Sequence, residues 1–127
     1  MNSTSAIIVA TLFFACCGCL QKNEQLPHDV QAALNKAQII IATNLAGNSV
    51  VISNSELANI VHAMEGAAHD PHTSSQADPK WMLQFYTGTN LLFSTPFQDH
   101  LFYVAGKEFR GDKVVLRRLQ ERLDSHE

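Results

Sequence analysis

Cysteine is absent from most of this sequence of 127 residues, and none occurs after Cys19. The stretch 20–127 therefore contains no disulfide and must be stabilised by its own hydrophobic core. About 100 residues suffice for such a core, although without much surplus. The length of the chain predicts one domain.

An excess of positive charge is also lacking, since the formal net charge is −3. A nucleic-acid-binding domain normally carries a basic face, so we expect no nucleic-acid partner. Six of the nine lysines and arginines lie beyond residue 106. Acidic residues are interspersed there, a pattern typical of a solvated helix face. These are Glu108, Asp112, Glu121, Asp124 and Glu127.

No apolar run is long enough for an ordinary membrane span, which needs ~20 residues. The longest is AIIVATLFFA, residues 6–15, which follows the polar start MNSTS. A run of this length that ends at small residues has the proportions of a signal-peptide core. No lysine or arginine precedes Lys22, so only the α-amino group represents the usual positive start.

All three cysteines follow this run, at positions 16, 17 and 19. The segment Leu12–Cys16 resembles the lipobox of bacterial lipoproteins. The resemblance implies that signal peptidase II cuts after Ala15 and that Cys16 carries the lipid. Gly18-Cys19 is the alternative cut. A conventional cleaved signal and an uncleaved anchor also stay open, whereas a Cys-Cys-x-Cys metal site lacks a nearby sequence that completes the ligand set.

This resemblance implies a division of the chain into three parts. Residues 1–15 are the signal peptide, residues 16–27 the lipidated N-terminus and tether, and residues 28–127 a single domain. Two or three acyl chains hold a protein stably on a membrane. We therefore expect a protein of the bacterial cell envelope, lipid-anchored to a membrane and facing the periplasm or the exterior.

A helix over residues 53–66 has the clearest pattern in the domain. Ser53 and Glu56 have the spacing of a capping box, in which each side chain binds the other residue's backbone amide. Leu57, Ile60, Val61 and Met64 then form one apolar stripe. The sequence predicts an amphipathic helix that packs across a sheet.

Shorter patterns predict the other elements. A helix opens near Pro27, a polar loop covers 67–80, and Asp112 caps a last helix. Alternating or β-branched runs predict strands at 38–43, 49–52, 81–86, 91–95, 101–104 and 108–110. The expected fold class is an α+β two-layer sandwich, a mainly antiparallel sheet with helices on one face, in the order α-ββ-α-βββ(β)-α.

The segments Ser53–Val61, Asp78–Tyr86 and Val104–Phe109 resemble small domains of uncharacterised bacterial lipoproteins of the YhfM-like kind. Those domains share a hairpin, a helix that opens on S/D-x-x-E-I, and a V-x-G-K-x-F/Y motif before the last helix. The resemblance implies the fold but no activity.

Histidines are the best candidates for chemistry. His62, His69, Asp70 and His72 could bind Zn²⁺ or Cu²⁺, although a solvated polar loop explains them as well. No serine lies in a G-x-S-x-G motif, and the sequence has no glycine-rich phosphate loop. Asp99-His100 suits either a catalytic dyad or a turn between strands. No cofactor is expected.

Aromatic residues are concentrated in the second half, and alternation assigns most of them to the core. Met82, Tyr86 and Tyr103 are expected on the other face of the sheet. If no element covers that face, the three residues mark a binding patch. The alternative is that the first helix or the 67–80 loop covers them.

Two functions follow from these patterns. The first is a membrane-anchored, non-catalytic binding or inhibitory module of the cell envelope, with a possible envelope protein as its partner. The alternative is a metal-binding protein or a metal-dependent hydrolase that uses the His62, His69 and His72 region.

Overall fold

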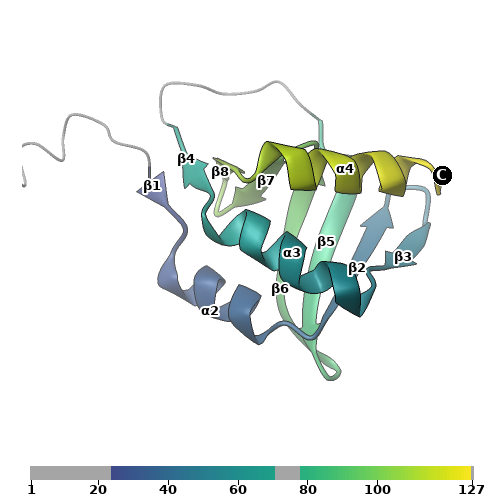
Figure 1. Ribbon diagram of the computed structural model, residues 1–127, viewed down its shortest axis with the longest axis horizontal. Coiled ribbons are helices and arrows are strands. Elements are labelled where there is room, and N and C mark those ends of the chain that lie inside the picture. Colours follow the sequence, from purple (N-terminus) through teal and green to yellow (C-terminus); the bar gives the residue numbers. More distant parts are fainter. Residues whose placement is uncertain (1–23, 71–77, 127) are drawn as a thin grey trace, which may run out of the picture.

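A computed structural model of the chain describes residues 24–70 and 78–126 (Figure 1). Eight strands form one sheet in the order β1-β4-β8-β7-β6-β5-β2-β3, and the neighbouring strands are antiparallel. In chain order the elements are β1 (Glu24–Gln25), α2 (His28–Lys36), β2 (Ile39–Asn44), β3 (Ser49–Val51), α3 (Asn54–Glu65), β4 (Ala68–His69), β5 (Trp81–Thr87), β6 (Asn90–Gln98), β7 (Leu101–Val104), β8 (Lys107–Arg110) and α4 (Lys113–Asp124).

The expected fold class is wrong, because the described elements run β-α-ββ-α-βββββ-α and not α-ββ-α-βββ(β)-α. The structure is largely sheet-based, with about 39% of the described residues in strands and 34% in helices. Two strands were not predicted: β1 lies in the expected tether and β4 in the expected loop. Each has two residues, too few for alternation to show in the sequence. Tertiary pairing forms them instead.

Strands β1 and β4 extend the sheet beyond β8. Glu24 pairs with His69 across β1 and β4, and Ala68 of β4 pairs with Arg110 of β8. The Lys107 ammonium donates to the Glu24 carboxylate at 2.7 Å, so β8 also holds β1 through side chains. This hydrogen bond lowers the pKa of Glu24 below its usual value.

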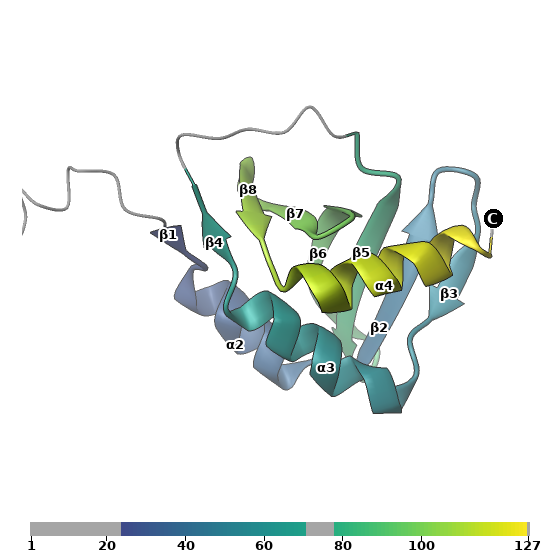
Figure 2. The ribbon, with the colours of Figure 1, turned by 45° about the horizontal axis from the view of Figure 1, so that its top comes forward.

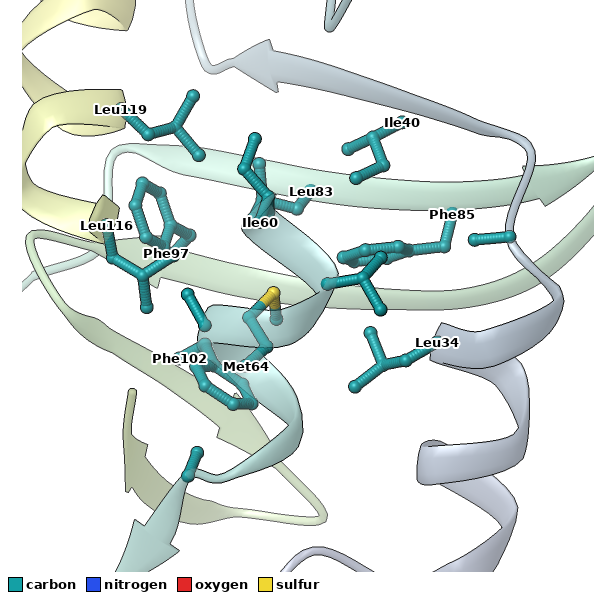
Figure 3. Close-up of a cluster of buried hydrophobic side chains, with 14 of the residues drawn as sticks. Leu34, Ile40, Ile60, Met64, Leu83, Phe85, Phe97, Phe102, Leu116 and Leu119 are labelled. Carbon is teal, nitrogen blue, oxygen red and sulfur yellow. The ribbon is translucent and has the colours of Figure 1, made fainter. Parts of the chain in front are cut away.

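One hydrophobic core lies between the helices and the sheet (Figure 3). Figure 3 shows side chains from α2, α3 and α4 pointing toward those of β5, β6 and β7. The core needs no disulfide, as the lack of cysteine after Cys19 requires. Its largest fully buried members are Trp81, Phe85, Phe97, Phe102, Phe109, Leu34, Ile40, Ile60, Met64, Leu83, Leu116 and Leu123.

The two faces of the sheet differ. Within the described residues the helices are α2, α3 and α4, and Figure 2 shows that they lie on one side of the sheet. Along β5, residues that point to the helices are buried and those between them are half-buried, as the period of two in a strand requires. We call the second face the helix-free face. On β5 its residues are Met82, Gln84 and Tyr86.

The helix ends follow the sequence in one case and depart from it in another. The Asp112 carboxylate accepts from the amides of Val114 and Val115 at 3.0 and 3.2 Å, so the predicted cap of α4 is confirmed. At α3 the predicted side-chain-to-amide bonds are absent. Ser53 Oγ donates to Glu56 Oε1 at 3.0 Å instead. Glu56 also pairs with Arg122, which joins α3 to α4.

Candidate functional site

A groove of about 520 Å³ lies at one end of the helix-free face. This volume is within the range of small-molecule sites. Strands β2, β5, β6 and β7, the β2–β3 turn and the segment before β5 supply its lining. The lining residues are Thr43, Asn44, Leu45, Pro79, Lys80, Trp81, Met82, Pro96 and Tyr103.

Strand register brings the groove residues together. Met82 pairs with Thr43 of β2 on one side and with Pro96 of β6 on the other. These three residues therefore point to the same face in one row across the sheet. The row forms a mainly apolar floor with one hydroxyl group.

Tyr103 is held in place by Thr95, which is fully buried. The Thr95 hydroxyl donates to the Tyr103 carbonyl oxygen at 2.7 Å and accepts from the Tyr103 amide at 3.0 Å. A side chain thus binds both main-chain groups of Tyr103, next to Pro96, which has no amide hydrogen. This fixes the backbone of β7 where Tyr103 lines the groove.

Trp81 connects the groove to α4. Its side chain is 2% exposed, and its indole Nε1 donates to Asp124 Oδ1 at 3.1 Å. Gln120 Nε2 donates to the same oxygen at 2.9 Å, and Gln120 Oε1 accepts from the Asp99 amide at 2.9 Å. The start of β5, where Trp81 precedes the groove residue Met82, is therefore positioned by a hydrogen-bonded chain that reaches the β6–β7 turn.

The β2–β3 turn presents Leu45 at the rim of the groove. Asn44 Oδ1 accepts from the Asn48 amide at 2.9 Å, and the Asn44 carbonyl accepts from the Gly47 amide at 3.1 Å. Gly47 has φ of 92°, a conformation that glycine adopts without steric cost. The Leu45 side chain is 97% exposed on this hydrogen-bonded turn. The turn thus holds a large apolar side chain in water.

Tyr86 lies on the helix-free face but does not line the groove. It pairs with Ile39 of β2 and Leu91 of β6 near the other end of β5. The structure therefore brings two of the three expected binding residues, Met82 and Tyr103, into one groove.

The histidines lie in different places. His62 is exposed on α3, and His69 is in β4. His69 Nδ1 lies 2.7 Å from the Glu108 carbonyl oxygen, so it donates there, because a carbonyl only accepts. Within residues 24–70 and 78–126, no three histidine, cysteine, aspartate or glutamate side chains could share a metal ion. Asp70 is described but His72 is not, so the metal site stays a prediction.

Asp99-His100 forms the tight turn between β6 and β7. Asp99 has φ of 59°, a left-handed conformation that aspartate and asparagine tolerate better than other residues with a Cβ. Arg117 binds its carboxylate with two hydrogen bonds, of 2.9 and 3.0 Å, and His100 Nδ1 lies 2.6 Å from Asp99 Oδ2. The hydrogen bonds from Arg117, then that from His100, lower the Asp99 pKa to about 2. The ion pair between Asp99 and Arg117 attaches the turn to α4.

Asp99→Asn is expected to lower the unfolding free energy at pH 7 by about 1 kcal/mol. The lowered pKa of Asp99 stabilises the fold above pH ~4, and this contribution is lost as the pH falls toward ~2. Exposure reduces its size, since the Asp99 side chain is 30% exposed and that of Arg117 48%. Urea unfolding from pH 7 to pH 2 should show the two proteins converging. Two results would contradict this role. One is a difference in unfolding free energy between the two proteins that stays constant with pH, and the other is an equal loss of unfolding free energy in the exposed variant Asp78→Asn.

The predicted lipidation sites Cys16 and Cys19 lie outside the described residues. In the described part of the chain, no helix has the length and apolar character to cross a membrane. The chain matches no protein-family model, no curated protein sequence and no solved structure.

Sequence reasoning missed much of the groove lining. Thr43, Leu45 and Pro96 come from three separated segments, and pairing through β5 brings them together. One signal was present: Leu45 is apolar within a run of turn residues, Asn44–Asn48. A single exposed apolar residue carries little weight, and it becomes informative only because the fold places it beside Pro79 and Met82.

Proposed function

We propose that this chain is a lipid-anchored, non-catalytic binding module of a bacterial cell envelope, and that its ligand occupies the groove on the helix-free face. The observation that supports the binding role is the groove itself. Met82 and Tyr103 line it together, on the face where the sequence placed them. The lipobox-like Ala15-Cys16 supports the anchor.

The rigid surroundings of the groove also favour binding. Thr95 holds Tyr103, Asp124 holds Trp81, and the Asn44 turn holds Leu45. A site whose walls are fixed before the ligand arrives loses less conformational entropy on binding. The groove therefore suits recognition of a ligand whose shape matches it.

The anchor is tested by mass spectrometry of the mature protein isolated from bacterial membranes. We expect an N-terminal, acylated Cys16, and we expect Cys16→Ser to leave the protein unprocessed. Acylation at Cys19 would place the signal-peptide cleavage site three residues later and would still support a lipid anchor. An intact, unmodified Met1 on the membrane protein would overturn the anchor.

Occupancy of the groove is tested with Tyr103→Cys, which places a thiol in the groove. Bound ligand should slow the labelling of this thiol by N-ethylmaleimide in intact cells. The reference is the same full chain, purified and reconstituted in liposomes. We expect the rate in cells to be about fivefold lower, as for a site mostly occupied by its ligand. Mass spectrometry distinguishes this thiol from the native cysteines.

Val114→Cys is the matched control, because Val114 is exposed on α4, away from the groove. It should react at the same rate in cells and in liposomes. Equal rates in the two settings for Tyr103→Cys as well would mean that the groove is empty in the cell, and would overturn the binding function.

A further inference from the structure

We propose that the groove binds a single-chain amphiphile with an anionic headgroup, with the apolar chain on the row Thr43, Met82 and Pro96 and the headgroup beside Lys80. This ligand class rests on the proposed function. It follows from three properties of the groove: its apolar floor, its single charge and its exposed rim.

The floor suits an apolar chain. Met82, Pro96 and Tyr103 present a thioether, a pyrrolidine ring and an aromatic ring from three adjacent strands. A methionine side chain is flexible and polarisable, so it adapts to an alkyl chain of variable conformation. Each methylene that leaves water for such a surface strengthens binding. A chain of moderate length would therefore bind through the floor.

Charge selects the headgroup. Among the described residues that line the groove, Lys80 is the only charged one. No described carboxylate forms an ion pair with Lys80. A carboxylate or phosphate at this position would gain a charge-assisted hydrogen bond, whereas an ammonium headgroup would be repelled. The Tyr103 hydroxyl adds a neutral polar group to the same lining.

The exposed Leu45 at the rim favours a ligand with a narrow chain over a partner protein with a flat surface. Leu45 is almost fully exposed at the end of β2, on a turn fixed by Asn44. It stands beside the groove and can cover a chain that lies on the floor. Burial of such a leucine against the ligand strengthens binding. A ligand that reaches from Lys80 along the floor would bring Leu45 out of water.

The test uses the fluorescence of Trp81, the sole tryptophan of the chain, which precedes the groove residue Met82 in β5 and has its ring on the helix side of that strand. A bromine atom quenches tryptophan over a short range that spans one strand, so a brominated amphiphile on Met82 reports its own binding. The full chain in phosphatidylcholine liposomes is titrated with ω-bromoundecanoate, the matching bromoalkyl phosphate, the alcohol and the ammonium. We expect saturable quenching by the two anions, at a half-saturation concentration about tenfold lower than that of the alcohol. The carboxylate and phosphate arms separate a fatty acid from a lysophospholipid-like ligand.

Variants assign the effect to the groove. Lys80→Gln should remove the preference for the anions over the alcohol, while Lys113→Gln on α4 should keep it. Equal quenching by the anions, the alcohol and the ammonium in the native chain would overturn the ligand class, as would linear, non-saturable quenching. If the quenching shows no preference for the anions but Tyr103→Cys is still protected from N-ethylmaleimide in cells, the binding function stands with another occupant, such as a protein. If the cell protection also fails, the proposed function fails.

Discussion

Met64→Ala is expected to lower the free energy of unfolding by about 3 kcal/mol. Met64 is fully buried on α3, and Figure 3 places it within the cluster of core side chains. Truncation removes three heavy atoms and leaves a cavity that the surrounding aromatic side chains fill only in part. Urea unfolding followed by circular dichroism measures the change, with the native chain as reference.

Met82→Ala is the matched control, because it makes the same change on the other face of the sheet. Met82 is half-buried in the groove, so the alanine variant leaves no closed cavity. We expect a loss of less than about 1 kcal/mol in unfolding free energy. The same variant should weaken quenching by ω-bromoundecanoate. Equal destabilisation by the two substitutions would mean that the helix-free face is part of the core.

The sequence predicted the longer elements because their patterns are local. The apolar stripe of α3 extends over three turns, and the alternation in β5 runs from Trp81 to Tyr86. Strand β6 runs to Gln98 and includes Pro96, so it extends beyond the predicted strand at 91–95. Pairing with β7 begins only at Phe97, so β7 requires no amide hydrogen from Pro96.

The sheet order could not be read from the sequence. Strand β2 pairs with β5, although β3, α3 and β4 lie between them in the sequence. The first described residues of the expected tether, Glu24 and Gln25, pair with β4, which itself pairs with β8. Such long-range pairing depends on which edges of the sheet are free, and no local pattern encodes it.

Only Met82 and Tyr103 of the candidate site were predictable, because long-range strand pairing brings the other lining residues to the groove. Alternation placed Met82 and Tyr103 on the helix-free face, and register decided that they share a groove while Tyr86 does not. The polar chain that positions Trp81 joins residues more than 40 positions apart, since Trp81 binds Asp124. The Asp99-His100 turn is part of this chain, and its hydrogen bonds to α4 give it a structural role.

Gly111→Ala is expected to lower the unfolding free energy by about 3 kcal/mol, because the site has no room for a Cβ atom. Such an atom would lie 2.6 Å from Leu116 Cδ1 and 2.7 Å from the Ala63 carbonyl oxygen. The backbone cannot easily move away from the contact. The Gly111 amide donates to the His100 carbonyl, and the Asp112 amide donates to the Ala63 carbonyl, both at 3.0 Å. Overpacking here therefore strains the junction of α3, β8 and α4.

Gly66→Ala is the control, because a Cβ atom at Gly66 meets nothing within 4 Å and its φ of −87° is open to alanine. We expect a change of less than about 0.5 kcal/mol for this variant. Thermal unfolding of the two variants and the native chain gives the comparison. In Gly111→Ala the shift of the junction should also reach Trp81 through α4, as a change in its emission maximum. A native-like melting temperature for Gly111→Ala would show that α4 can move off α3 without loss, and that the polar chain from Asp99 to Asp124 does not fix its position.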